Sequence, residues 1–228
     1  MIVAISQPRY LPAPIYLQRI KLIDKFILLD DVQHSREFEN RNYIKTPQGA
    51  KWLTINCQKK KSRLKINELK ISNMHWIEEH KEIIRRNYSK ANYYSEELLE
   101  KIYDFTADED FTQCILLYLK NILKIFEIDT EIIRSSSLGT DSKGAIKLVD
   151  ICEKVNADIY LSGINGRDYI QDEFKAAGIG VKYHIYEHPV YTQLWGDFLP
   201  WMGFIDALFN VGIDKFKLML NSDFKYED

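Results

Sequence analysis

The chain has 228 residues, of which 46% are hydrophobic and 28% are charged, and this composition excludes a disordered or low-complexity protein. Its net charge of −2 gives no general attraction to nucleic acid or to an acidic membrane surface. Three cysteines stand far apart without a C-x-x-C pair, which argues against a disulfide framework and predicts a reducing, cytoplasmic location.

No segment reaches the roughly 18 consecutive apolar residues of a membrane span. Arg9 and the prolines interrupt the only early apolar run, so no signal peptide is predicted. We expect residues 1–228 to form one domain, with residues 74–127 as a helical insertion or lid within it. That section could also serve as the interface of a homodimer.

The first sixty residues alternate between strand and helix patterns. An apolar run at 2–5 predicts a strand, and the three prolines within 7–14 exclude regular structure after it. Residues 15–24 predict a helix and residues 25–31 a buried strand, which favours a parallel pair joined by a right-handed crossover. Residues 51–57 predict a further strand.

The rest of the chain continues this alternation after a helical section. Three helices are predicted between residues 74 and 127. Strands then follow at 130–136, 157–163 and 181–187, and helices at 142–155, 168–178 and 203–212. The pattern predicts an α/β fold with a mostly parallel sheet flanked by helices.

Polar residues follow four of the predicted strands. They are Ser6 and Gln7, then Asp30, Asp31 and Gln33, then Ser135 and Ser136, then Ser162 and Gly163. The carboxyl ends of parallel strands meet at one edge of a sheet, where α/β proteins bind their ligands. We therefore expect these residues to line one shared cleft.

Asp30 and Asp31 are the strongest candidates for chemistry. If both lie in the strand, their side chains point to opposite faces, so at most one enters the cleft. That carboxylate would anchor an amino group or a sugar hydroxyl, or act as a general base toward an amine. The alternative is a pair of turn acids that cap the next segment.

Residues 39–42 place a guanidinium between two amides. Arg41 is predicted to contact a diphosphate, because its forked donors match phosphate oxygens. Asn40 and Asn42 are candidates for substrate binding, and hydrogen bonds within the loop are the alternative for them.

His80 stands on an otherwise apolar stripe of a predicted helix. It is either a general base or a core histidine with satisfied hydrogen bonds. His184 and His188 fall in a strand-like segment, where one face would hold them about 13 Å apart, too far for one metal ion. No metal site is predicted from these or other residues.

Hydroxyl and amide side chains near two later strands complete the candidates. Ser135 and Ser136 would bind phosphate or carboxylate, or cap the following helix. Tyr191 and Gln193 alternate along an extended segment, so they share one face. They would stack on a base or sugar ring and hydrogen-bond to it, or close the aromatic core at an edge.

The sequence resembles the WbqC-like protein family in the order and spacing of several stretches. They are "SQPRYLP", "FILLDDVQHS", "NRNYI", "KWLTI", the isolated His80, "ADIYLSG" followed by Tyr169, and "VYTQLWGDFLPWMGFIDALFNVG". Together they span residues 1–213. Gln7, Tyr10 and Tyr169 belong to these stretches and are predicted to contact substrate.

The resemblance implies a role in the biosynthesis of bacterial O-antigen and other surface polysaccharides. Within such a pathway we predict acyl or aminoacyl transfer to the amine of a nucleotide-linked sugar, with His80 or Asp31 as the base. The activated donor would be a thioester, an aminoacyl-tRNA or an ATP-derived adenylate. An aminoacyl-tRNA would need a basic surface, for which the run at 59–63 is the one indication.

Three other functions remain open at this stage. One is a different sugar-modifying reaction in the same pocket, and another is a module that binds a sugar nucleotide or a partner enzyme without catalysis. The third is an ATP-using amide ligase, because the polar loops after the first two strands resemble those of nucleotidyltransferase-like α/β proteins in their topology.

Overall fold

The computed structural model describes residues 1–58, 64–167, 170–221 and 225–227. In this part of the chain the main sheet contains β1 (Ile2–Ser6), β2 (Lys25–Leu28), β5 (Glu131–Arg134), β6 (Ile159–Gly163), β7 (Gly180–Ile185) and β8 (Lys225–Glu227). Their order is β5-β2-β1-β6-β7-β8. The first five are parallel and β8 is antiparallel to β7. The predicted α/β fold with a mostly parallel sheet is therefore confirmed.

Eight α-helices surround this sheet in the described residues. They are α1 (Pro14–Lys21), α2 (Trp76–Tyr88), α3 (Glu96–Ile102), α4 (Phe111–Ile125), α5 (Gly144–Lys154), α6 (Gln171–Ala176), α7 (Phe204–Val211) and α8 (Ile213–Leu220). Three short 3₁₀ helices accompany them: η1 (Ile66–Glu68), η2 (Ser135–Ser137) and η3 (Ile164–Gly166). The helical section predicted in the middle of the chain is present as α2, α3 and α4, whereas α8 was not predicted.

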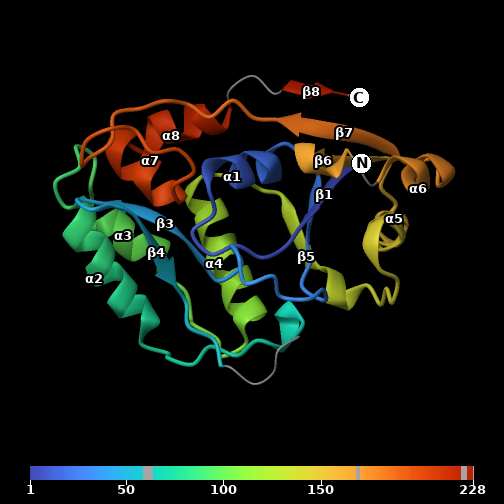
Figure 1. Cartoon of the computed structure of the whole chain (residues 1–228), viewed down its shortest axis with the longest axis horizontal. Coiled ribbons are helices and arrows are strands. Elements are labelled where there is room, and N and C mark those ends of the chain that lie inside the picture. Colours follow the sequence, from blue (N-terminus) through green and yellow to red (C-terminus); the bar gives the residue numbers. More distant parts are fainter. Residues whose placement is uncertain (59–63, 168–169, 222–224, 228) are drawn as a thin grey trace.

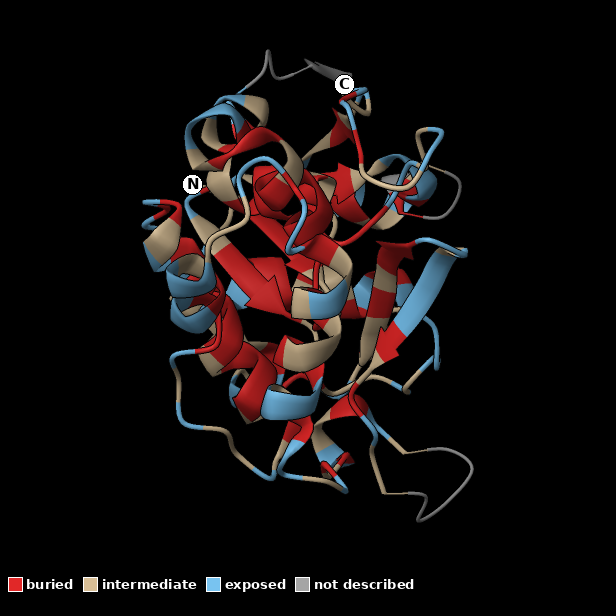
Figure 2. Cartoon of the chain, turned by 90° about the vertical axis from the view of Figure 1, so that its left-hand side faces the viewer, coloured by how far each residue is buried: buried red, intermediate tan, exposed pale blue. Residues whose placement is uncertain are grey.

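The two faces of the sheet bury alternate residues of the same strands. In β1, Ala4 packs with α1, α4, α7 and α8, while Val3 and Ile5 pack with α5 and α6. This alternation follows from the pleat of a strand and gives three layers, with helices on both faces. Figure 2 shows the buried residues gathered around the central strands, and exposed residues on the outward turns of the helices.

A separate β-hairpin holds the strand that was predicted at 51–57. β3 (Arg41–Thr46) and β4 (Gly49–Thr54) pair antiparallel, with Thr46 opposite Gly49 across a two-residue turn. The left-handed φ of +93° at Gly49 suits a residue without a side chain. The hairpin lies with α2 and α3 on the opposite side of the sheet from α5 and α6 (Figure 1).

The strand order contains a point where the chain changes direction across the sheet. From β1 the chain moves outward through β2 to β5, and it then returns to the other side of β1 to form β6 and β7. The loops after β1 and β6 therefore diverge, and they leave a crevice at the carboxyl edge where such folds bind ligands. None of the described helices is long and apolar enough to cross a membrane.

Candidate functional site

A cavity of about 680 Å³ opens at this point, above the carboxyl ends of β1, β6 and β7. Ile5 contributes from β1, Ser162 and Gly163 from β6, and His184 from β7. The predicted residues Ser162 and Gly163 are thus placed at a ligand-sized opening in the crevice between diverging loops. We call this opening the switch-point cavity.

Two arginines give the switch-point cavity its charge. Arg9 comes from the loop after β1 and Arg19 from α1, and both line the cavity. Within the described part of the chain, neither guanidinium forms an ion pair with a carboxylate. Arg9 instead lies over the rings of Tyr16 and Phe38, with its Cζ 5.9 and 5.3 Å from their centroids.

Arg19 is held in place by neutral groups. Its Nε donates to Nδ1 of His184 at 3.4 Å, and a Cβ on Gly163 would lie 3.1 Å from its Nη2. Burial lowers the pKa of Arg19, and the positive charge of Arg9 lowers it further. A guanidinium stays protonated even so, and the cavity therefore carries two positive charges that a bound anion would neutralise.

His184 serves as a fixed acceptor for this arginine. Its Nε2 lies 2.8 Å from Oε1 of Gln18, which accepts the ring N–H, while Nδ1 accepts from Arg19. Burial lowers the pKa of His184 to about 4, and Arg19 adds to this shift. The imidazole is therefore neutral at physiological pH.

A smaller cavity of about 280 Å³ adjoins the switch-point cavity. Arg9, Arg19 and Trp201 line both openings. Ser6 and Asn42 complete the polar lining of the smaller one. The two arginines thus stand between two compartments, which is the position for an anionic group in the middle of a longer ligand.

A third cavity, of about 570 Å³, lies farther along the same edge and contains Asp31. The predicted residues Gln7 and Gln33 line it as well. Gln7 follows Ser6 of the smaller arginine cavity in the chain, but the two cavities have no lining residue in common, and we call the third opening the Asp31 cavity. The predicted clusters do not share one cleft: Ser162 and Gly163 line the switch-point cavity, Ser6 the smaller arginine cavity, and Gln7, Asp31 and Gln33 the third cavity. Ser135 and Ser136 line none of these cavities.

Asp31 is an ionised carboxylate with two close donors. Lys147 Nζ on α5 lies 2.6 Å from its Oδ2, and Ser135 Oγ donates to its Oδ1. Burial alone would raise the pKa of Asp31, but these hydrogen bonds outweigh burial and hold the pKa below its ordinary value.

Asp30 and Asp31 do not alternate across a strand as expected. β2 ends at Leu28, so both residues lie in the loop after it, and both carboxylates contact Ser135. Asp30 is fully buried and accepts hydrogen bonds from Arg134 Nε at 2.7 Å and from Ser136 N and Oγ at 2.9 Å each. In this arrangement Ser135 and Ser136 hold Asp30 at the joint between β2 and β5.

The side chains of residues 39–42 are mostly used to fix the loop. Arg41 donates to the carbonyls of Arg36 and Glu37 at 2.9 and 2.8 Å, and Asn40 donates to Ile55 O at 2.8 Å. Asn42 donates to Leu11 O at 2.6 Å and also borders the smaller cavity. The long polar loop after β2 is thus held mainly by its own hydrogen bonds. Its polar side chain in the smaller arginine cavity is that of Asn42.

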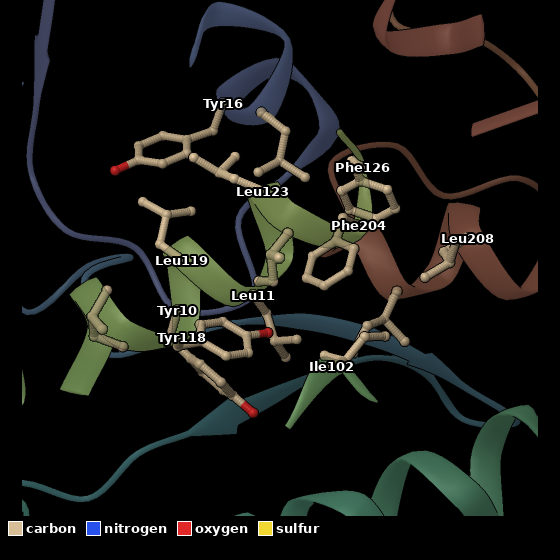
Figure 3. Close-up of a cluster of buried hydrophobic side chains, with 14 of the residues drawn as sticks. Tyr10, Leu11, Tyr16, Ile102, Tyr118, Leu119, Leu123, Phe126, Phe204 and Leu208 are labelled. Carbon is tan, nitrogen blue, oxygen red and sulfur yellow. The ribbon is translucent and has the colours of Figure 1, made fainter. Parts of the chain in front are cut away.

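His80 and Tyr10 lie together in the aromatic core, away from the three cavities. Tyr10 Oη is 2.8 Å from Nδ1 of His80 and 2.6 Å from the hydroxyl of Tyr103. Figure 3 shows Tyr10 beside Tyr118 among buried leucines. Burial lowers the pKa of His80 to about 4. His80 lines none of the cavities described above.

Tyr191 and Gln193 do share one face, and that face is turned toward Asp206 of α7. Their Oη and Nε2 donate to its Oδ2 at 2.8 and 2.7 Å, and Tyr88 donates to its Oδ1 at 3.0 Å. Lys45 Nζ donates to Oε1 of Gln193 and to the backbone carbonyls of Gly196 and Asp197. This buried network fixes the segment 190–203.

Two predictions fall outside the described residues. They are Tyr169 and the basic run at 59–63. In the part of the chain that the structure does describe, no group of three or more His, Cys, Asp or Glu side chains is placed to hold a metal ion.

Four residues that line the switch-point cavity were not among the predicted site residues: Arg9, Arg19, His184 and Trp201. Arg9 stands inside "SQPRYLP", so its place after the first strand was a usable signal. Arg19 lies in a helix, and only the packing of α1 against β6 brings it over Gly163.

The fold and these cavities define a doubly wound α/β protein with a cationic crevice at the switch point of its sheet. Residues 7–218 match the WbqC-like protein family, and the chain belongs to that family. The protein of Mycobacterium tuberculosis (strain ATCC 25618 / H37Rv) described as "Uncharacterized protein Rv1507c" is 34% identical over 221 residues, which cover 93% of this chain and 94% of the relative. No solved structure matches the chain significantly.

Proposed function

We propose that this protein binds a nucleotide-linked amino sugar and transfers an acyl or aminoacyl group to its amine, in the assembly of bacterial surface glycans. The observation that carries the proposal is the pair of guanidinium groups, Arg9 and Arg19, that face the switch-point crevice without a carboxylate partner in the described chain. Both arginines are half-buried, cations in such positions are usually paired, and a diphosphate would supply the missing negative charge.

The arrangement of cavities supports a ligand with three parts. The nucleoside would occupy the switch-point cavity, the diphosphate would lie on Arg9 and Arg19, and the sugar would extend past Ser6 and Gln7 toward Asp31. The loop between β1 and α1 contains no glycine, so arginine side chains rather than close backbone N–H groups would hold the diphosphate.

Asp31 is the proposed general base. The sugar amine would attack the carbonyl carbon of the activated donor, and Asp31 would take a proton from the nitrogen. The new C–N bond forms as the bond to the leaving group breaks, which releases a thiol, a tRNA hydroxyl or AMP according to the donor. Asp31 is preferred to His80 because it lines a cavity, whereas His80 is enclosed by aromatic side chains.

A second function is supported by the same carboxylate. Each carboxylate oxygen of Asp31 already accepts a hydrogen bond, one from Lys147 and one from Ser135. Both oxygens are therefore partly occupied when a proton has to be taken up. That observation favours a module that binds a nucleotide-linked sugar for a partner enzyme without catalysing a reaction.

The thermal stability of the protein should rise in the presence of nucleotide-linked sugars, and most with those that carry a 3- or 4-amino group. A ligand at 100 times its dissociation constant stabilises the folded state by about 2.7 kcal/mol, which a melting experiment detects. The panel would include ATP and acetyl-coenzyme A as candidate donors. A panel in which no sugar nucleotide shifts the melting temperature would contradict the proposal.

Replacement of Asp31 by asparagine separates the two functions. The enzyme should keep its affinity for the sugar nucleotide within a few-fold and lose roughly 100-fold or more in transfer rate, since general bases contribute about 10²–10⁴-fold. The matched control is Asp141→Asn, at an exposed carboxylate that lines the same cavity. Equal transfer rates for Asp31→Asn and its parent would remove Asp31 from the mechanism.

A further inference from the structure

Trp201 is exposed at the wall between the two arginine cavities. It lines both of them, and 49% of its surface is accessible even though it is one of the largest apolar side chains. The ring of His188 packs edge-on against it at a centroid distance of 5.0 Å and 81°. Trp201 therefore has a fixed neighbour on one side and an accessible surface beside Arg9 and Arg19.

The backbone holds Trp201 in an uncommon conformation. Its φ of +65° is left-handed, which costs a bulky residue free energy unless the surrounding structure imposes it. The surroundings do impose it, because Trp201 N donates to Nε2 of His188 at 3.1 Å and Gly203 N donates to Tyr43 O at 2.8 Å. The buried network around Asp206 fixes the chain just before this point.

Trp195 provides an internal comparison in the same segment. It also has a φ of +65°, but its indole Nε1 donates to Asn87 O at 3.0 Å, so its side chain anchors the segment. The indole of Trp201 forms no hydrogen bond within the described residues. A rigid, strained and exposed aromatic ring at the mouth of a cationic cavity is poorly explained by packing, but it suits stacking on a flat ring of a ligand.

We propose that Trp201 is the stacking platform for the nucleobase of the nucleotide-linked ligand, next to the diphosphate contacts of Arg9 and Arg19. This inference rests on the proposed function. The base is preferred to the sugar because the reacting amine has to reach Asp31, on the other side of the arginines, whereas the base can remain at the open rim. Aromatic rings stack on every base, so this contact would add affinity with little selectivity among bases.

The test compares a nucleoside diphosphate with its parts, by calorimetric titration of the full chain. The probes are whichever of UDP, dTDP, GDP and ADP stabilises the parent protein most, inorganic pyrophosphate, and N-acetylglucosamine 1-phosphate. Trp201→Ala should bind the nucleoside diphosphate roughly 5- to 100-fold more weakly, as expected for the loss of one stacked base. Its affinity for the other two probes should change less than about twofold, and Trp201→Phe should retain most of the affinity for the nucleotide.

The control variant is Trp52→Ala, at an exposed tryptophan of β4 that lines neither arginine cavity. It should bind all probes as the parent does. If Trp201→Ala binds pyrophosphate and the nucleoside diphosphate more weakly by the same factor, the inference is overturned in favour of a role in positioning the arginines. If only the affinity for the sugar phosphate falls, it is overturned in favour of a stacked sugar. If Trp201→Ala binds the nucleotide as tightly as the parent does, the stacking role of Trp201 is overturned and the proposed function is not. If the parent protein binds no nucleotide, the proposed function is overturned as well.

Discussion

Replacement of Arg19 by methionine is expected to reduce the affinity for nucleotide-linked sugars by at least roughly 30-fold. Truncation of one partner in a buried, hydrogen-bonded charge pair costs about 2–5 kcal/mol, and 1.4 kcal/mol corresponds to a factor of ten. Methionine keeps much of the length and apolar contact of the side chain while it removes every donor. Arg19→Lys should bind with intermediate affinity, because it keeps the charge but loses the fork that matches phosphate oxygens.

The unliganded protein supplies the second readout. Arg19 is a half-buried cation without a carboxylate partner among the described residues, so its removal should leave the melting temperature unchanged or raise it. A matched control is Arg86→Met, at an exposed arginine on α2 that pairs with Glu82, which should leave affinity unchanged. If Arg19→Met unfolds more easily and binds the ligand as tightly as its parent, Arg19 is a structural residue.

The sequence was sufficient for the five parallel strands and for the polar residues that follow them. Short apolar runs before Ser6, Asp30 and Ser162 indicated buried parallel strands, because strands covered on both faces lose the polar alternation of a half-exposed strand. The polar residues that follow these strands were therefore expected to lie at the same edge of the sheet. The pattern could not show which polar groups face the solvent there and which face one another.

The difference between Asp30 and Asp31 illustrates that limit. Adjacent carboxylates have the same local propensities, but β2 ends before them, and the backbone then turns Asp30 toward the Arg134 and Ser136 donors of the neighbouring strand end. Those donors lie more than 100 residues away in the chain. Only the parallel pairing of β2 with β5 brings them together.

Tyr191 and Gln193 illustrate this limit as well. Their alternation correctly indicated a common face, yet an extended segment has two sides, and the one that holds Asp206 is buried. Arg19 was overlooked because a cation on an amphipathic helix usually faces the solvent. Here α1 packs beside the crevice, so that one position on the helix reaches into it.

The free energy of unfolding should fall steeply between pH 7 and pH 4.5 because His80 and His184 are buried in their neutral form. Burial lowers both pKa values from 6.5 to about 4. In the unfolded chain these imidazoles take up protons below about pH 6.5, whereas in the folded protein they do so only near pH 4. The stability that they contribute is therefore complete above pH 6.5, and each loses about 2–3 kcal/mol of it by pH 4.5.

Other groups modify this decline in a known direction. Burial also lowers the pKa values of His34 and His188, which adds to the loss. Burial raises the pKa of Asp206, so its protonation favours the folded state as the pH falls and opposes the decline. The hydrogen bonds to Asp31 hold its pKa below the ordinary value, so its contribution is lost at lower pH than that of the histidines.

Urea denaturation of His80→Gln and His184→Gln at pH 7 and pH 4.5 isolates the two contributions. Each variant is expected to be less stable than the parent at pH 7, because a hydrogen-bonded core side chain is replaced, but its loss between the two pH values should be smaller by about 2–3 kcal/mol. His75→Gln, at an exposed histidine just before α2, is the control for the substitution itself. Parallel pH dependence in the parent and His80→Gln would mean that the pKa of His80 is the same in the folded and unfolded states, which would contradict the lowered pKa of the buried imidazole.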